Sequence, residues 1–484
     1  MTERPIGRAW AAAAVAGVVV AAAFLHLHGV NGPDYWRWEW RTPAALVSTV
    51  LLLALAASPA LVAQRVRRPG LAVALLCVAV MALQLTANAI EPGLRGTARI
   101  RRVAADQLTT SYYTVAESIV RAEQSGHPVD WIRQYDEILR LAPQHATTKP
   151  PGPIAFYVAV ICLFGTANAP LAAAGLLALF SAGSVAATWW AARTIAGDAA
   201  ALQSATLMAL APSMAVFFLY LDPAYPILSC AMLVTWYLAL KSGSAASAVT
   251  FGLVLFLTTL TSYTLLVMGF VLAGMTIFSF GSLRTPQSAL RMIRMETIGF
   301  SVFLAAYGVL WLSTGFNPVS AFRTAVDMQY RYLPLLHRPY PETIPWDALD
   351  FCLGSGWVPV LLAALWLTTR RNEQAPRTRS VVIWGLLTPA VVALTGLIQA
   401  ETARVWIFLL PLLMIPAGLE LSRWPPRLRA VAHVAMIAVT IALYANMTFI
   451  GISSRPPPRA QPRAASRSRA CRTVSCRALR RSPP

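Results

Sequence analysis

Long apolar runs recur along almost the whole chain, and they constrain its fold more than any other feature. A run of about 17–25 apolar residues forms a helix that can cross a hydrocarbon core of roughly 30 Å. Hydrophobic residues make up 57% of the sequence and charged residues 12%, about half the charged share of a soluble domain. We therefore predict an all-α polytopic membrane protein.

The apolar runs define a set of candidate spans. These are 9–27, 44–63, 71–90, 153–168, 171–191, 200–219, 224–240, 246–260, 263–280, 296–314, 352–369, 380–399, 405–421 and 430–450. No small-residue cleavage site follows the first run, so we expect a retained helix instead of a signal peptide. The loop charges require an odd number of crossings between 153 and 280, where six runs occur. One of these six is expected to be half-length or re-entrant, giving about 13 spans in total.

Basic residues in short loops set the expected orientation, because they concentrate on the cytoplasmic side. Arg4 and Arg8 place the N-terminus inside, and the loop with Arg65, Arg67 and Arg68 is inside again after two crossings. The 91–152 segment then lies outside. The net charge of +20 is explained by such loops and by nine arginines after Ser454, so no nucleic-acid partner is inferred. We predict a multi-pass protein of the cytoplasmic membrane.

Four regions follow from this pattern. Residues 1–90 form N-terminal spans, 91–152 an extracytoplasmic loop, 153–451 a helical bundle, and 452–484 a disordered tail rich in Arg and Pro. Within the loop, Tyr112, Val115, Ile119 and Val120 fall on helical spacing, and so do Trp131, Tyr135, Ile138 and Leu139. Two amphipathic helices on the membrane surface would suit this spacing.

The same loop carries the densest group of residues able to do acid–base or phosphate chemistry. Asp106 opens it, and His145, Lys149 and the rigid Pro150-Pro151-Gly152 close it at the mouth of a span. Asp106 has an ordinary interpretation as a solvated cap or ion-pair partner. Lys149 is suited to bind a lipid phosphate, or is an interfacial lysine whose amine reaches the headgroups. The residues alone do not decide between a functional and a structural role for either Asp106 or Lys149.

This loop resembles the first extracytoplasmic loop of the GT-C glycosyltransferases. The resemblance is carried by Asp106-x₅-Tyr-Tyr-x₂-Ala and by His145-x₃-Lys149-Pro-Pro-Gly, which leads into a span. The most similar branch uses polyprenyl-phosphate sugars and includes protein O-mannosyltransferases and lipid A aminoarabinose transferases. The resemblance implies a multi-span bundle with its active site on the outer face. It also implies that Asp106 is the general base and that His145 and Lys149 hold the donor phosphate.

Two departures from the family pattern stand in the same region. Gln107 occupies a position where the family often has an acid, and two spans precede the loop where the aminoarabinose type has one. The resemblance therefore covers roughly residues 100–450 and not the N-terminal part. Gln107 also keeps a catalytically inactive family member among the alternatives.

Further candidate residues lie outside the loop. Asp222, in Pro212-x₉-Asp-Pro, resembles the family's second acidic position, although a turn carboxylate would look the same. Glu401 and Arg404 resemble a pair that faces the cavity in related bacterial enzymes. They could pair with one another, or Arg404 could take a phosphate bidentately. Asp34, in an outer segment dense in aromatics, is the reserve candidate for the catalytic acid.

The prediction is a membrane glycosyltransferase that moves a sugar from a polyprenyl-phosphate donor to an acceptor outside the cytoplasmic membrane. The alternative is a multi-span transporter or lipid flippase. Transporters place ionisable residues near the membrane midplane and show internal repeats, whereas here the acids gather at span ends and no repeat is seen. No metal-binding motif occurs in the sequence, and participation of a divalent cation is left open. The sugar and the acceptor are not specified.

Overall fold

The computed structural model of the protein describes most of the chain. The described residues are 30–31, 37–40, 46–90, 94–106, 111–126, 130–143, 145–279, 285–334, 340–369, 375–399 and 401–449. The predicted first span at 9–27, the reserve candidate Asp34 and the predicted tail at 452–484 lie outside these ranges.

Helices make up nearly all of the described structure. The first group is α2 (Leu46–Ala63), α3 (Pro69–Ile90), α4 (Gly96–Ala105), α5 (Ser111–Gln124), α6 (Tyr135–Leu141), α7 (Gly152–Ala196), α8 (Asp198–Leu210), α9 (Pro212–Val216) and η1 (Asp222–Ala224). The middle group is α10 (Tyr225–Ser242), α11 (Ala245–Thr261), η2 (Tyr263–Val267), α12 (Met268–Gly274), η3 (Met275–Ser279), α13 (Pro286–Thr314) and α14 (Pro318–Tyr332). The last group is α15 (Thr343–Ser355), α16 (Val358–Thr369), α17 (Pro376–Thr395), α18 (Thr402–Val405), η6 (Ile407–Leu409), α19 (Leu410–Leu421) and α20 (Pro426–Asn446).

Three short strands complete the fold. They are β1 (Val30–Asn31), β2 (Arg37–Trp40) and β3 (Met447–Phe449), and they pair antiparallel in the order β1-β2-β3. Trp38 on β2 is paired with Phe449 on β3, so the segment before α2 is joined to the end of α20.

Within the described residues, six helices are long and apolar enough to cross a membrane, or seven if the bent pair α15–α16 forms one span. They are Pro69–Ile90, Gly152–Ala196, Asp222–Ser242, Pro286–Thr314, Pro376–Thr395 and Pro426–Tyr444. The multi-pass membrane character is thus confirmed, and the predicted count of about 13 spans is not.

Helix breaks that hydropathy does not detect are one reason for the lower number, and another is that the predicted spans 153–168 and 171–191 lie in the single helix α7. The predicted span 200–219 is divided at Pro212, where α8 ends and a helix of only five residues begins. The predicted span 352–369 is bent by 106° between α15 and α16. Gly356 and Trp357 both have positive φ at this bend. Several apolar runs are therefore present as shorter helices instead of full crossings.

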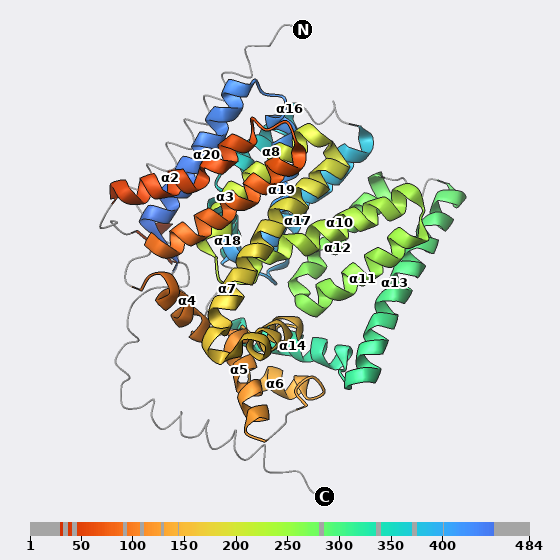
Figure 1. The fold of residues 1–484 in the computed structure, drawn as a ribbon. Coiled ribbons are helices and arrows are strands. Elements are labelled where there is room, and N and C mark those ends of the chain that lie inside the picture. Colours follow the sequence, from red (N-terminus) through yellow and green to blue (C-terminus); the bar gives the residue numbers. More distant parts are fainter. Residues whose placement is uncertain are drawn as a thin grey trace, which may run out of the picture.

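The amphipathic helices gather at one end of the bundle. Figure 1 shows α4, α5, α6 and α14 at the lower end of the view, beneath the long helices. The α5 helix turns Tyr113, Ala116, Ile119 and Val120 inward and packs against α7, while α6 packs against α14. The described part of the 91–152 segment thus holds three helices, and α5 and α6 fall in the two stretches where helical spacing was seen. They lie at the end of the bundle where the candidate site is found.

Candidate active site

A cavity of about 440 Å³ opens at the end of the bundle that the amphipathic helices cover. Its walls come from α5, the turn before α7, the η1 and η2 segments, α14, and the turn that precedes α18. Five of the residues singled out in the sequence line it together, and they are His145, Lys149, Asp222, Glu401 and Arg404. Residues separated by more than 250 positions in the sequence thus meet in one site.

Lys149 is held from two sides in the turn between α6 and α7. Its ammonium donates a hydrogen bond to Thr264 Oγ1 at 3.2 Å, and its backbone oxygen accepts one from the Tyr135 hydroxyl at 2.8 Å. Gly152, which ends the Pro-Pro-Gly sequence, lies directly against the backbone of Leu260 and Thr261, and a Cβ there would overlap Leu260 O. This contact brings the start of α7 beside η2 and so places Lys149 next to Thr264.

Asp222 is fixed by the segment that joins α9 to α10. The backbone makes an irregular turn there, with Leu219 at φ 83°, and Asp222 then begins the 3-10 helix η1. The next residue, Pro223, accepts a hydrogen bond through its carbonyl from Ser184 on α7 at 2.6 Å. The half-buried carboxylate of Asp222 is thus presented to the cavity from a segment anchored on two helices.

Arg404 combines an ion pair with an aromatic contact. Its Nη2 lies 2.5 Å from Glu401 Oε2, and its guanidinium carbon lies 4.8 Å from the centre of the Tyr220 ring. The side chain is buried, and its Nε has no hydrogen-bond partner within the described structure. Arg404 therefore combines a buried N–H donor that has no partner among the described residues with a side chain that lines the cavity.

The cavity concentrates charge in a buried setting. Burial lowers the pKa of Lys149, while the Asp222 carboxylate raises it and the Arg404 guanidinium lowers it further. Burial also disfavours the charged form of Arg404, but Glu401 and Asp222 outweigh this and raise its pKa. For Tyr112 on α5, burial and then Asp222 raise the pKa, so this residue is a neutral phenol at physiological pH. The site thus holds two cations, two carboxylates and a phenol donor.

Asp106 is not among the residues that line this cavity. It caps the C-terminal end of α4, where its backbone N–H donates to Val103 O at 3.2 Å, and its side chain is half-buried. The stretch 107–110 that follows lies outside the described residues. The structure therefore brings together the downstream candidates with His145 and Lys149 in one cavity, and Asp106 is not part of the lining.

Several lining residues were not given a role from the sequence. Tyr220 and Tyr263 lie in apolar stretches and were given no role. On α14, Phe322, Ala325, Val326, Gln329 and Tyr330 line the cavity with spacings of three and four residues. That spacing is the detectable signal, because it places all five on one face of a helix.

Metal-ligating residues do not cluster in the part of the chain that the structure describes. No group of three or more His, Cys, Asp or Glu residues there is arranged to hold a metal ion.

Comparison with known proteins finds similar structures but no similar sequences. No protein-family model and no curated protein matches the sequence. The archaeal oligosaccharyltransferase AglB from Archaeoglobus fulgidus, in complex with an inhibitory peptide and a dolichol-phosphate, superposes with a TM-score of 0.50 at 12% identity, over 91% of this chain and 60% of that one. ArnT from Cupriavidus metallidurans in the apo state gives a TM-score of 0.47 at 18% identity, over 74% and 61% of the two chains.

The chain shares the fold of this AglB structure, which supports the GT-C resemblance of the sequence at the level of the fold. The protein spans 60% of the length of the AglB chain and 61% of the ArnT chain. At such low identity, the likeness concerns the arrangement of the helices and not the chemistry of the site.

Proposed function

We propose that the protein is a glycosyltransferase that moves a sugar from a polyprenyl-phosphate donor to an acceptor on the extracytoplasmic face of the cytoplasmic membrane. The observation that carries this proposal is the cavity in which Lys149 and Arg404 stand beside Asp222. It combines cations for a phosphate with a carboxylate for a proton. The placement of basic residues in the sequence supports the extracytoplasmic side.

The phosphate of the donor would bind between Lys149 and Arg404. A guanidinium and an ammonium are the side chains best suited to a phosphate, and both Lys149 and Arg404 line the cavity. His145 lines the same wall. These cations would stabilise the negative charge that develops on the phosphate oxygen as the sugar leaves.

Asp222 is the carboxylate that this arrangement favours as general base. The acceptor hydroxyl or amine attacks the anomeric carbon of the sugar, and the bond from that carbon to the phosphate oxygen breaks with its electron pair. The proton of the acceptor passes to Asp222, and polyprenyl phosphate departs. Glu401 is paired with Arg404, so it orients the cation instead of taking the proton. The motif resemblance points to Asp106 for the same role, and the two assignments are separable by experiment.

Apolar side chains of the same cavity could contact the hydrocarbon part of the donor. Phe322 and Val326 of α14, and Leu333 just after it, line the same cavity as the charged residues, and Tyr263 meets Phe322 edge-to-face with ring centres 5.1 Å apart. A cavity lined by both charged and apolar side chains suits a donor that has a phosphate and a hydrocarbon chain. The AglB structure of the same fold contains a dolichol-phosphate, which is consistent with this class of donor.

The test is transfer of radiolabel from a panel of polyprenyl-phosphate sugars in membranes that contain the protein. Wild type is compared with Asp222→Asn, Asp106→Asn and the surface control Glu123→Gln on α5, which is exposed. We expect transfer by wild type and the control and a loss of about 10²–10⁴-fold in Asp222→Asn.

The outcomes distinguish the assignments. Loss in Asp106→Asn with full activity in Asp222→Asn would return the role of base to Asp106. No transfer from any donor by wild type would contradict the proposed function and favour the transporter or flippase alternative.

A further inference from the structure

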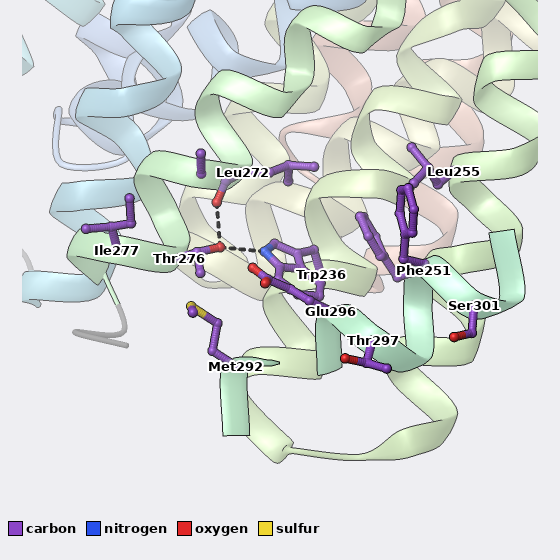
Figure 2. Close-up of a pocket in the computed structure, with 12 residues that line it drawn as sticks. Trp236, Phe251, Leu255, Leu272, Thr276, Ile277, Met292, Glu296, Thr297 and Ser301 are labelled. Carbon is purple, nitrogen blue, oxygen red and sulfur yellow. Dashed lines mark hydrogen bonds between the residues drawn. The ribbon is translucent and has the colours of Figure 1, made fainter. Parts of the chain in front are cut away.

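A second cavity, of about 760 Å³, lies between α10, α11, α13 and the α12–η3 segment. Figure 2 shows its walls, with Trp236 and Phe251 on one side and Met292, Glu296 and Thr297 of α13 on another. It shares no lining residue with the candidate active site. Its residues come from apolar helices, so a molecule dissolved in the membrane is the one that can reach it.

The second cavity lies toward the opposite end of the same helices. Asp222 of the active site and Trp236 are 14 residues apart (236 − 222) on one continuous helical segment. At a rise of 1.5 Å per residue this corresponds to about 21 Å. With the active site at the extracytoplasmic end, as proposed, the second cavity faces the cytoplasmic leaflet. Arg291 and Arg294 precede Glu296 on α13 and accord with that side.

Among the described residues, Glu296 is the only charged one that lines this cavity. Figure 2 shows its carboxylate reaching into the space beside Trp236. The indole N–H of Trp236 does not donate to the Glu296 carboxylate, because it donates to Thr276 Oγ1 at 2.7 Å. The Thr276 hydroxyl in turn donates to Leu272 O. Among the described residues that form the wall, none is basic. The carboxylate thus lacks a cation from the lining of the cavity.

An ionisable side chain within a membrane helix is unfavourable without a partner and marks a functional site by default. Because the described lining offers no cation, a ligand that enters from the membrane can supply it. Aromatic faces beside a carboxylate are the setting that binds an ammonium group, through charge pairing and cation–π attraction. Phe251, Leu255 and Phe300 continue the cavity as an apolar surface for a hydrocarbon chain.

We propose that this cavity binds an aminophospholipid of the cytoplasmic leaflet. The lipid ammonium pairs with Glu296 beside Trp236, and one acyl chain lies along Phe251, Leu255 and Phe300. Lipids that carry only a negative headgroup are disfavoured, because Glu296 repels them and the described lining includes no basic residue. The site is independent of the transfer reaction, since it is separate from the residues to which that reaction is assigned.

The test is native mass spectrometry of the purified protein after exchange into mixed micelles. These contain equal amounts of phosphatidylethanolamine and phosphatidylglycerol with the same acyl chains. We expect wild type to retain phosphatidylethanolamine in about fivefold preference, the size expected for a partly desolvated cation contact. Glu296→Gln should lose this preference, and Glu123→Gln on α5 should keep it. N-acetylated phosphatidylethanolamine, which lacks the ammonium, should not compete.

Three results would overturn the proposal. They are equal retention of both lipids by wild type, an unchanged preference in Glu296→Gln, and retention of neither lipid. Gel filtration of each variant shows whether it remains folded. A second variant, Trp236→Leu, should reduce the preference while leaving the carboxylate in place, so the result does not depend on one substitution.

Discussion

The carboxylate of Asp350 on α15 accepts a hydrogen bond from the backbone N–H of Ala403, at 2.5 Å, and so fixes the turn that carries Arg404. Thr402 adds a second link, since its hydroxyl donates to Asp347 O at 2.6 Å and lies 3.3 Å from Asp350 Oδ2. Glu401 has a positive φ of 54°, which is uncommon for a residue with a side chain. Hydrogen bonds with α15 thus fix the strained turn at Glu401 and help to orient the guanidinium of Arg404.

Replacement of Asp350 tests this positioning role. Asp350→Ala leaves the buried Ala403 N–H without its acceptor, at a cost of about 1–3 kcal/mol. Asp350→Asn retains an oxygen acceptor. We expect the Ala variant to raise the KM for the lipid donor about tenfold and the Asn variant to recover most of the loss. Transfer kinetics measure both, with Asp327→Ala on α14 as the surface control. If both Asp350 variants lowered kcat equally and left the KM for the donor unchanged, Asp350 would not position Arg404 toward the phosphate.

Arg404→Lys tests whether the phosphate needs a guanidinium. Lysine keeps the positive charge but provides neither the planar fork nor the contact over Tyr220, which lies 4.8 Å from the Arg404 guanidinium carbon. We expect donor affinity to fall about tenfold, with the protein still folded because the charge opposite Glu401 is retained. Binding of a labelled polyprenyl phosphate measures the effect. Unchanged affinity would remove Arg404 from the phosphate site.

The pH dependence of the reaction should report Lys149. Its pKa is lowered by burial, so on raising the pH it loses its proton earlier than an ordinary lysine. The protonated form binds the phosphate, so kcat/KM for the donor should fall on the alkaline side of the profile. In Lys149→Arg the guanidinium stays charged, and this limb should move to higher pH. If kcat/KM fell at the same alkaline pH in wild type and in Lys149→Arg, Lys149 would not be the group that causes the fall.

The sequence allowed the fold class and five of the cavity residues to be predicted, because hydropathy and short motifs are local signals. Helix breaks were not accessible in the same way. Trp357 adopts positive φ only because the surrounding packing holds the α15–α16 bend. The buried carboxylate of Asp350 also gave no signal, since its partner Ala403 is 53 positions away in the sequence. Asp106 carries the motif without lining the cavity, and the stretch 107–110 beside it lies outside the described residues.

Gly152 offers a test of why the Pro-Pro-Gly sequence stands at the mouth of α7. A Cβ at this position would overlap Leu260 O and lie 3.1 Å from Thr261 Cα, both backbone atoms that cannot rotate away. Gly152→Ala should therefore separate α7 from the end of α11, at a cost of about 1–3 kcal/mol, and draw Lys149 away from Thr264. Gly70→Ala on α3 is the matched control, because nothing lies within 4 Å of its added Cβ. Thermal unfolding followed by fluorescence should show a lower Tm for Gly152→Ala and an equal or slightly higher one for Gly70→Ala. A normal Tm together with normal donor KM in Gly152→Ala would show that this close contact does not position the site.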